Sequence, residues 1–236
     1  MILFLGGLLP GVSVPDPAST KADLRWVRPP QQVRSQETLA RILDAAEALV
    51  AEKGFEDTPV AEVARRAGSS VGAFYTRFKD KDGLLHALYD RYYEQAIATA
   101  DDALEPSRWD HSGIPEIVES VVDFLVEIYR EQRGLIRAFV IRNHSDPDFQ
   151  ARRDRLSHHV SERLSKLLLE RRDEITHPDP VRAATFGLTL VFSTLDSTML
   201  FGEMRAGDLA IDDRDLATEL SRAYLAYLGI PVASAQ

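Results

Sequence analysis

The stretch Ala67-Gly68-Ser69-Ser70-Val71-Gly72-Ala73-Phe74-Tyr75-Thr76-Arg77-Phe78-Lys79-Asp80-Lys81 decides how the rest of the chain is interpreted. Gly68 marks a tight turn, and a helix is predicted to follow it over about residues 70–78. A short helix is predicted before the turn, with Thr58 as its N-cap and Pro59 as its first residue. A helix, a glycine turn and a second helix form the unit that sets a recognition helix into the major groove of DNA.

The residues around this motif also have helical periodicity. An apolar stripe from Leu39 to Val50 predicts a helix that ends at Gly54, and another helix begins near Lys81 with Asp80 as its cap. Turn-forming residues separate further predicted helices at about 114–131, 134–143, 149–173, 179–203 and 213–228. No stretch alternates apolar and polar residues long enough to predict a sheet.

Composition excludes several classes of protein. The chain has no cysteine, so it has no disulfide, iron–sulfur cluster or thiolate nucleophile. Residues 21–85 carry eleven basic and ten acidic side chains, whereas residues 86–236 carry seventeen and twenty-six, so the net charge of −9 comes from the second part. The apolar run at residues 2–9 is too short to span a membrane, and we expect a cytoplasmic protein with no membrane partner.

The motif residues resemble the N-terminal domain of the tetracycline repressor (TetR) family over about residues 34–85. The matching positions are Thr58, Glu62, Val63, Ala64, Ala67, Gly68, Ser70, Gly72, Tyr75, Phe78, Lys81, Leu84 and Leu85. The resemblance implies an all-α fold with an N-terminal three-helix DNA-binding domain and a larger C-terminal helical domain for ligand binding and dimerisation. The expected division is a disordered tail at 1–30, the helix-turn-helix domain at 31–80 and the helical domain at 81–236.

The resemblance also implies which residues face DNA. Thr58, Tyr75 and Lys81 match positions at the phosphate backbone, where hydroxyl and ammonium groups donate to phosphate oxygens. The positions that can face bases are Ser70, Val71, Ala73 and Thr76. Small hydroxyl and methyl groups at these positions can touch acceptors or thymine methyl groups. The expected partner is therefore a double-stranded DNA operator.

Two predicted helices near the C-terminus suit dimerisation. Their apolar stripes are Val181, Ala184, Leu188, Val191 and Leu195 in the first, and Leu216, Leu220 and Tyr224 in the second. In the family these positions pair across a two-fold axis as a four-helix bundle, which implies a homodimer. The alternative is that both stripes are buried within one subunit.

Side chains between the motif and these helices are candidates for a pocket that holds an unknown small-molecule effector. They are Phe124, Ile128, Tyr129, Phe139, Phe186, Thr189 and Phe192, and each could instead be an ordinary core residue. We expect no cofactor and no metal site, because the adjacent His158 and His159 cannot chelate one ion together on a helix. No motif of a catalytic site is found. The sequence therefore predicts a repressor that a small molecule releases from a palindromic operator, with a helical adaptor that has lost DNA binding as the alternative.

Overall fold

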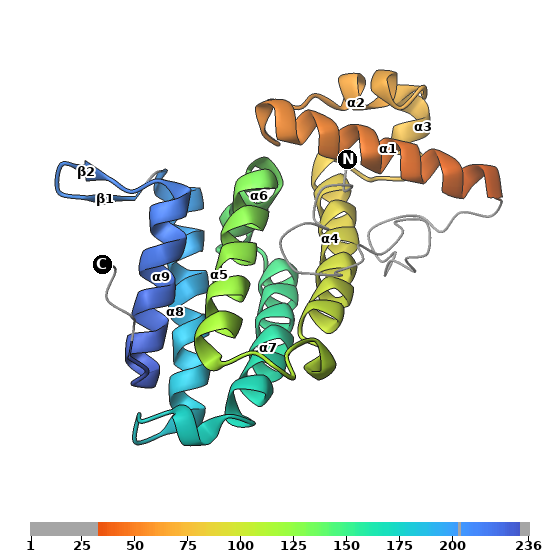
Figure 1. Cartoon of the computed structure of the whole chain (residues 1–236). Helices are drawn as coiled ribbons and strands as arrows, with labels where there is room; N and C mark the ends of the chain where they lie inside the picture. The colour runs from red at the N-terminus through yellow and green to blue at the C-terminus, as the bar shows by residue number, and fades with distance from the viewer. Residues whose placement is uncertain (1–32, 203, 232–236) are drawn as a thin grey trace. The chain divides into compact units, whose positions relative to one another are not determined.

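The computed structural model describes residues 33–202 and 204–231, and the tail predicted at 1–30 lies outside these residues. Nine α-helices make up almost all of the described structure (Figure 1). They are α1 Val33–Lys53, α2 Val60–Arg66, α3 Val71–Tyr75, α4 Lys81–Ala103, α5 Ile114–Glu131, α6 Arg133–Asn143, α7 Pro147–Leu169, α8 Pro180–Phe201 and α9 Asp213–Leu228. Two short 3-10 helices are Pro106–Arg108 and Arg172–Glu174. The all-α prediction is confirmed.

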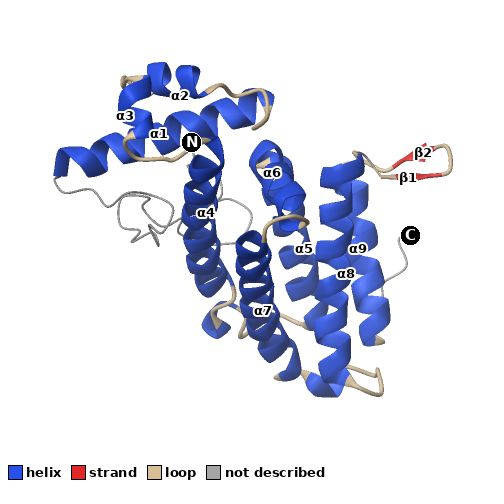
Figure 2. Ribbon diagram, turned by 180° about the vertical axis from the view of Figure 1, so that it is seen from behind, coloured by secondary structure: helices blue, strands red, loops and turns tan. Residues whose placement is uncertain are grey.

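One small hairpin was not predicted from the sequence. Strands β1 Arg205–Ala206 and β2 Leu209–Ala210 pair antiparallel between α8 and α9 (Figure 2). Gly207 lies in the turn with a φ of 64°, a left-handed conformation that favours glycine. Two residues per strand are too few for an alternating pattern to be visible in the sequence.

Local signals at the helix ends explain most of the observed bounds. Gly54 has a φ of 83°, and its N–H donates to the Val50 carbonyl at 2.8 Å, as expected of a glycine that ends a helix. The carboxylates of Asp179 and Asp212 accept from backbone N–H groups in the first turns of α8 and α9. The prediction for α2 was wrong in one respect, because the N-cap is Pro59 and not Thr58.

The chain forms two compact units, each built from two separate stretches of the sequence. The described part of the first unit comprises residues 33–96 and 132–152, and that of the second comprises 97–131, 153–202 and 204–231. The first unit therefore contains α6 and the start of α7 in addition to α1, α2, α3 and most of α4. Helices α4 and α7 each run through from one unit to the other.

The core of the first unit joins the predicted DNA-binding helices to α6 and α7. Phe139 on α6 stacks against Tyr89 on α4 with ring centroids 4.3 Å apart, and Phe149 on α7 stacks on the same tyrosine at 4.9 Å. A Cβ atom at Gly134 would overlap the carbonyl oxygen of Val50. This glycine is the second residue of α6, and its lack of a side chain permits the close approach of α6 to α1.

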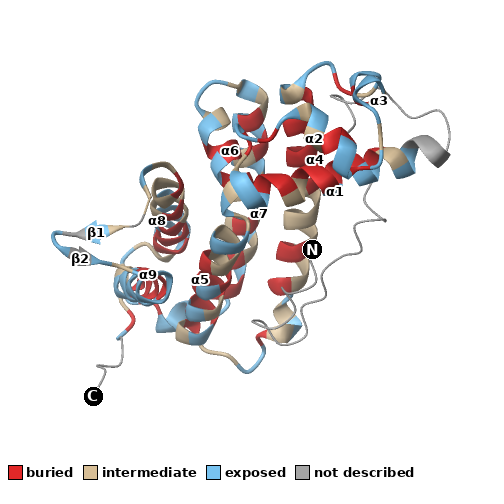
Figure 3. Ribbon diagram, turned by 90° about the horizontal axis from the view of Figure 1, so that it is seen from above, coloured by how far each residue is buried: buried red, intermediate tan, exposed pale blue. Residues whose placement is uncertain are grey.

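Helices α5, α8 and α9 pack together as the core of the second unit, and their buried faces lie toward one another (Figure 3). The hydroxyl of Tyr224 on α9 donates to the carbonyl of Ala184 on α8 at 2.5 Å. Burial raises the pKa of Tyr224 well above its ordinary value, so the phenol remains a donor. Directly beside it, Gly187 leaves the space that the Tyr224 ring occupies.

Among the described helices, α8 is the one that is long and apolar enough to cross a membrane by length and composition. Core helices of globular proteins meet the same criterion, and Ala184, Leu188 and Leu195 on α8 are buried against the neighbouring helices. The length and composition of α8 are therefore weak evidence for a membrane span.

Replacement of Gly187 by alanine should destabilise the protein. A Cβ atom there would overlap the Tyr224 ring, which the buried hydrogen bond to Ala184 holds in place. We expect Gly187→Ala to lower the free energy of unfolding by about 1–3 kcal/mol, as overpacking commonly does, measured by urea denaturation. Gly113→Ala is the matched control, because a Cβ atom there would make an ordinary contact of 3.6 Å with Pro115. Equal stability of the two variants would contradict the close packing of α8 and α9.

Candidate nucleic-acid interface

Helix α3 presents a small exposed surface at the centre of the predicted DNA-binding motif. Ser70 caps the helix, since its Oγ accepts from the backbone N–H of Ala73 at 3.1 Å. The Thr76 hydroxyl donates to the Ala73 carbonyl at 2.7 Å. The side chains of Ser70, Val71 and Thr76 are exposed and that of Ala73 is half-buried. The four predicted base-facing residues therefore lie on one short helix and its two ends.

The helix itself is shorter than predicted, since it ends at Tyr75 and not near Phe78. Phe74 and Phe78 are fully buried, and their rings pack 4.9 Å apart. Tyr75 is 50% exposed, and its ring meets the edge of Phe74 with centroids 5.3 Å apart. The aromatic pair thus anchors α3, while half of Tyr75 remains exposed.

Lys81 is the first residue of α4, and contacts with the loop before α2 hold its ammonium group in place. Its Nζ donates to the carbonyl of Glu56 at 2.9 Å and lies 4.5 Å from the centroid of the Phe55 ring. An ammonium group has three donors, so this bond leaves two for a phosphate oxygen. The same contacts hold the loop between α1 and α2 against α4, which gives Lys81 a structural role as well.

The structure does not support a phosphate contact by the side chain of Thr58. This residue is 1% exposed, and its hydroxyl donates to the carbonyl of Gly54 at 2.7 Å. The hydroxyl therefore stabilises the turn between α1 and α2. Sequence spacing could place Thr58 near the start of α2 but could not show that its side chain points inward.

Some basic side chains near α3 bond to other groups of the same chain, and others are exposed. The Nη1 atom of Arg77 donates to the Ala73 carbonyl at 3.1 Å, and Arg66 pairs with Glu52 at 2.6 Å. Arg65 and Lys79 are exposed. The surface around α3 thus offers a few cations, in keeping with the small positive charge of residues 21–85.

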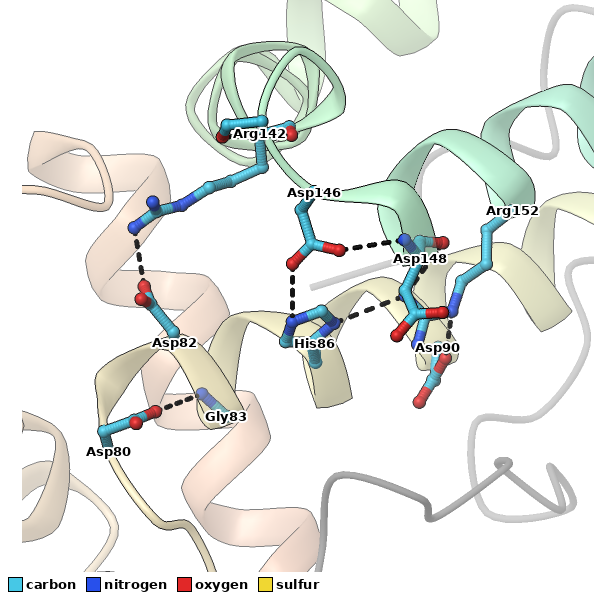
Figure 4. A network of polar contacts seen from close by, with 10 residues as sticks. Asp80, Asp82, Gly83, His86, Asp90, Arg142, Asp146, Asp148 and Arg152 are labelled. Carbon is cyan, nitrogen blue, oxygen red and sulfur yellow. Dashed lines mark hydrogen bonds and ion pairs between the residues drawn. The ribbon is translucent and has the colours of Figure 1, made fainter.

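A network of polar side chains lies within the first unit and ties α4 to α6 and α7 (Figure 4). Arg142, in the last turn of α6, pairs with Asp82 in the first turn of α4 at 2.6 Å. The ring nitrogen Nε2 of His86 lies 3.1 Å from a carboxylate oxygen of Asp146, whose other oxygen accepts from the Asp148 N–H at 2.9 Å. These bonds fix the joint between α6 and α7 against α4.

Arg152 forms the buried end of this network. Its side chain is 2% exposed, its Nε donates to Asp90 at 2.7 Å, and its Nη1 lies 3.4 Å from Nδ1 of His86. Because arginine can only donate, Nδ1 of His86 accepts, and the proton of a neutral imidazole is on Nε2, where it donates to Asp146. Loss of one partner of a buried ion pair leaves the other charge uncompensated, at a cost of about 3–5 kcal/mol. No local sequence pattern indicates this network, because its members are far apart along the chain.

The predicted effector-pocket residues divide into three groups. Phe124, Ile128, Tyr129 and Phe192 belong to the core of the second unit or pack against it. Phe139 is buried in the core of the first unit. Phe186 and Thr189 are exposed on α8 and lie outside that core. Tyr129 has a further contact, since its hydroxyl donates to Asp196 at 2.7 Å.

The predicted dimer stripes are mostly internal to the subunit, as the alternative interpretation held. Ala184, Leu188, Val191, Leu195, Leu216, Leu220 and Tyr224 are all buried. Val181 is 59% exposed near the start of α8, whereas Phe186 at 49% and Leu190 at 39% are four residues apart and share a face further along the helix. The exposed apolar face therefore lies to one side of the predicted stripe. The Phe186 ring meets that of Tyr227 on α9 with centroids 5.2 Å apart, so this face reaches α9.

The histidines do not assemble a metal site in the described part of the chain, where no group of three His, Cys, Asp or Glu side chains is placed to hold an ion. His159 instead lies 2.7 Å from Asp101, which also pairs with Arg163 at 2.6 Å. His158 is exposed.

Comparison with known proteins finds matches over most of the described chain. Residues 42–88 match the family model "Bacterial regulatory proteins, tetR family", and residues 114–228 match "Tetracyclin repressor-like, C-terminal domain". The HTH-type transcriptional regulator UidR of Escherichia coli is 27% identical over 120 residues, which are 51% of this chain and 59% of UidR. BetI of Serratia proteamaculans is 46% identical over 82 residues, which are 35% of this chain and 39% of BetI.

A solved structure is similar over nearly its whole length. The putative TetR-family transcriptional regulator from Mesorhizobium loti has a TM-score of 0.64 at 19% identity, with 84% of this chain and 98% of that one covered. At this identity the likeness establishes the fold. The sequence match with UidR spans little more than half of that relative.

The buried His86 should make the stability of the protein depend on pH. Burial lowers the pKa of His86 below its ordinary value of 6.5, and the nearby Arg152 guanidinium acts in the same direction, although Asp146 and Asp148 oppose both. Between the folded and unfolded pKa values only the unfolded chain binds the proton. The free energy of unfolding should therefore fall as the pH drops below about 6.5, and this loss should stop growing below the folded pKa.

Urea denaturation at pH 7.5 and 5.5 measures this effect. His86→Gln should lose less stability between the two pH values than the wild type does. The exposed His158→Gln is the control and should behave as the wild type. An identical pH dependence in His86→Gln would show that another group is responsible.

Proposed function

Because the chain belongs to the tetracycline repressor family, we propose that it is a homodimeric DNA-binding repressor that a small-molecule effector releases from a palindromic operator. The observation that carries this proposal is the exposed face of α3, within the region that matches the N-terminal family model. Ser70, Val71 and Thr76 are exposed there, with Tyr75 beside them. The function places the protein in the cytoplasm.

The contacts with DNA divide into two kinds. Tyr75 and Lys81 donate to phosphate oxygens and position α3, whereas Ser70, Val71, Ala73 and Thr76 face the base edges. A hydroxyl can bond to a base acceptor, and the methyl groups of Val71 and Ala73 can contact the methyl group of thymine. Such a surface discriminates weakly between sequences, since it contains no bidentate side chain.

Dimerisation compensates for this weak surface. Two copies related by a two-fold axis read two half-sites, which doubles the length of the operator. The exposed apolar face of Phe186 and Leu190 is the surface we assign to the second copy. On α9 it is continued by Tyr227 and by the exposed small residues Ala223 and Ala226, which permit close packing between subunits.

Substitutions at the phosphate contacts should weaken DNA binding for all sequences alike. We expect Lys81→Ala and Tyr75→Phe each to lower the affinity for operator DNA, Lys81→Ala by about tenfold or more, since hydrogen bonds to charged groups contribute about 1.5–3 kcal/mol. Lys81→Ala should also reduce the dependence of log K on log salt by about 0.9, the contribution of one phosphate. The measurement is fluorescence anisotropy on fragments that the protein selects from genomic DNA.

Lys166→Ala is the matched charge control, because Lys166 is exposed on α7 in the second unit. Circular dichroism checks that Lys81→Ala is folded, since Lys81 also holds the loop at Glu56. If both variants bind selected DNA as the wild type does, or if the wild type selects no fragment, the protein is a helical adaptor that has kept the fold and lost DNA binding.

Charged substitutions on the exposed face of α8 should dissociate the dimer. Phe186→Glu combined with Leu190→Glu places two carboxylates where the second copy would bury apolar surface. Sedimentation equilibrium should show a dimer for the wild type and a monomer for the variant, and the variant should lose its preference for a palindrome over a single half-site. Ile141→Glu is the control, because Ile141 is a comparably exposed aliphatic residue in the first unit, at 42%. A monomeric wild type would contradict this assignment.

A further inference from the structure

Three polar side chains from three helices meet in the second unit. Asp196 on α8 accepts a hydrogen bond from the Tyr129 hydroxyl on α5 through one oxygen and from Nη2 of Arg153 on α7 through the other, both at 2.7 Å. The Asp196 side chain is 15% exposed. Both of its oxygens therefore have partners, and the carboxylate links α5 and α7 to α8.

Arg153 is partly exposed and has hydrogen-bond donors that the group does not use. Its side chain is 43% exposed, and Asp196 is the one hydrogen-bond partner that it has among the described residues. Burial acts against the charge of Arg153, but the hydrogen bond and charge of Asp196 outweigh it and raise the pKa of the guanidinium. A guanidinium has five N–H donors in a planar fork, so several remain available to a ligand.

Each of the three polar residues has a half-buried apolar side chain one helical turn away on its own helix. Leu125 lies one helical turn from Tyr129, Leu156 one turn from Arg153, and Phe192 one turn from Asp196. All three pack against the core of the second unit from its margin. An open arginine fork is thus flanked by apolar and aromatic surface, the combination that recognises an acidic group attached to an apolar body.

We propose that Arg153 is the anchor for the effector and that the effector is a carboxylic acid with an apolar body, an inference that rests on the effector-controlled function proposed above. The carboxylate binds N–H groups of Arg153 in competition with Asp196, and the apolar body lies against Leu156 and Phe192. A cationic ligand is disfavoured, because Asp196 already accepts from two donors and Arg153 would repel it. A neutral ligand gains the apolar contacts but not the charge-assisted hydrogen bonds.

The position of Arg153 in α7 explains how such a ligand would act on the first unit. The preceding residue, Arg152, is buried and bound to Asp90 of α4. A ligand that draws Arg153 away from Asp196 breaks the ion pair that links α7 to α8. Helix α7 begins in the first unit, at the network around His86. The ligand therefore changes the restraint on a helix that both units share.

Two sets of matched compounds test the proposal on the full-length protein. They are 3-phenylpropionate, 3-phenylpropanol and 3-phenylpropylamine, and octanoate, octanol and octylamine. Isothermal titration calorimetry should show saturable binding of the acids, at least about tenfold tighter than the matched alcohol or amine. Arg153→Met should lose this preference for the acid, and Arg153→Lys should retain part of it. Arg155→Met, which removes an exposed arginine from the same helix, should bind as the wild type.

Three results would overturn the assignment of Arg153: no saturable binding of either acid, an alcohol or amine bound as tightly as its acid, or an unchanged affinity for the acid in Arg153→Met. Affinity for DNA is measured separately with and without the acid. The acid should weaken DNA binding by the wild type but not by Arg153→Met, and no change in the wild type would overturn the effector role. A wild type that binds no DNA would instead contradict the proposed function, while calorimetry would still decide the Arg153 site.

Discussion

The buried ion pair of Arg152 and Asp90 is the constraint on which the arrangement of the first unit depends. A guanidinium that is almost fully buried must be compensated, and here Asp90, His86 and the backbone of Asp148 provide partners. These groups come from α4 and from the start of α7. Because they can satisfy Arg152 only when the two helices are in register, the start of α7 and the preceding α6 become part of the same compact unit as the predicted DNA-binding helices. The region that supports α3 is thus larger than the 50 residues that resemble the N-terminal family domain.

Local features of the sequence were sufficient to predict most of the helices. The predicted ranges 114–131 and 213–228 agree with α5 and α9, because turn-forming residues at Gly113, Asp212 and Gly229 limit these helices from both sides. The motif around Gly68 was placed correctly for the same reason, since a left-handed φ of 61° in a two-helix turn favours glycine. The exposed positions of Ser70, Val71, Tyr75 and Thr76 also follow from local spacing, because burial of Phe74 and Phe78 fixes which side of α3 faces outward.

Local sequence features did not predict the contacts between helices. Helix α8 is apolar on two sides, so the spacing of Ala184, Leu188 and Leu195 could not be distinguished from that of Phe186 and Leu190 as the face that the subunit buries. The structure distinguishes them, because the Tyr224 hydrogen bond and the space at Gly187 commit the first set to α9. Thr58 was misjudged, and the packing role of Gly134 was not predicted, for a related reason. The role of each depends on a close contact with α1 or its end, at Gly54 and Val50, which periodicity does not report.

The consecutive residues Arg152 and Arg153 of α7 have different roles because the fold gives them different neighbours. Residues 152 and 153 point about 100° apart around a helix, so they must meet different neighbours. One is buried against Asp90 on α4, and the other is partly exposed beside Asp196 on α8. The buried pair has few alternatives, because separation would leave two uncompensated charges, whereas the exposed arginine can exchange its partner for a ligand at little cost. The two adjacent ion pairs thus differ in how readily they can change. A regulator needs this difference in a helix that both units share. The Arg153–Asp196 pair, which responds to the ligand, must break before the Arg152–Asp90 pair, which holds the DNA-binding helices.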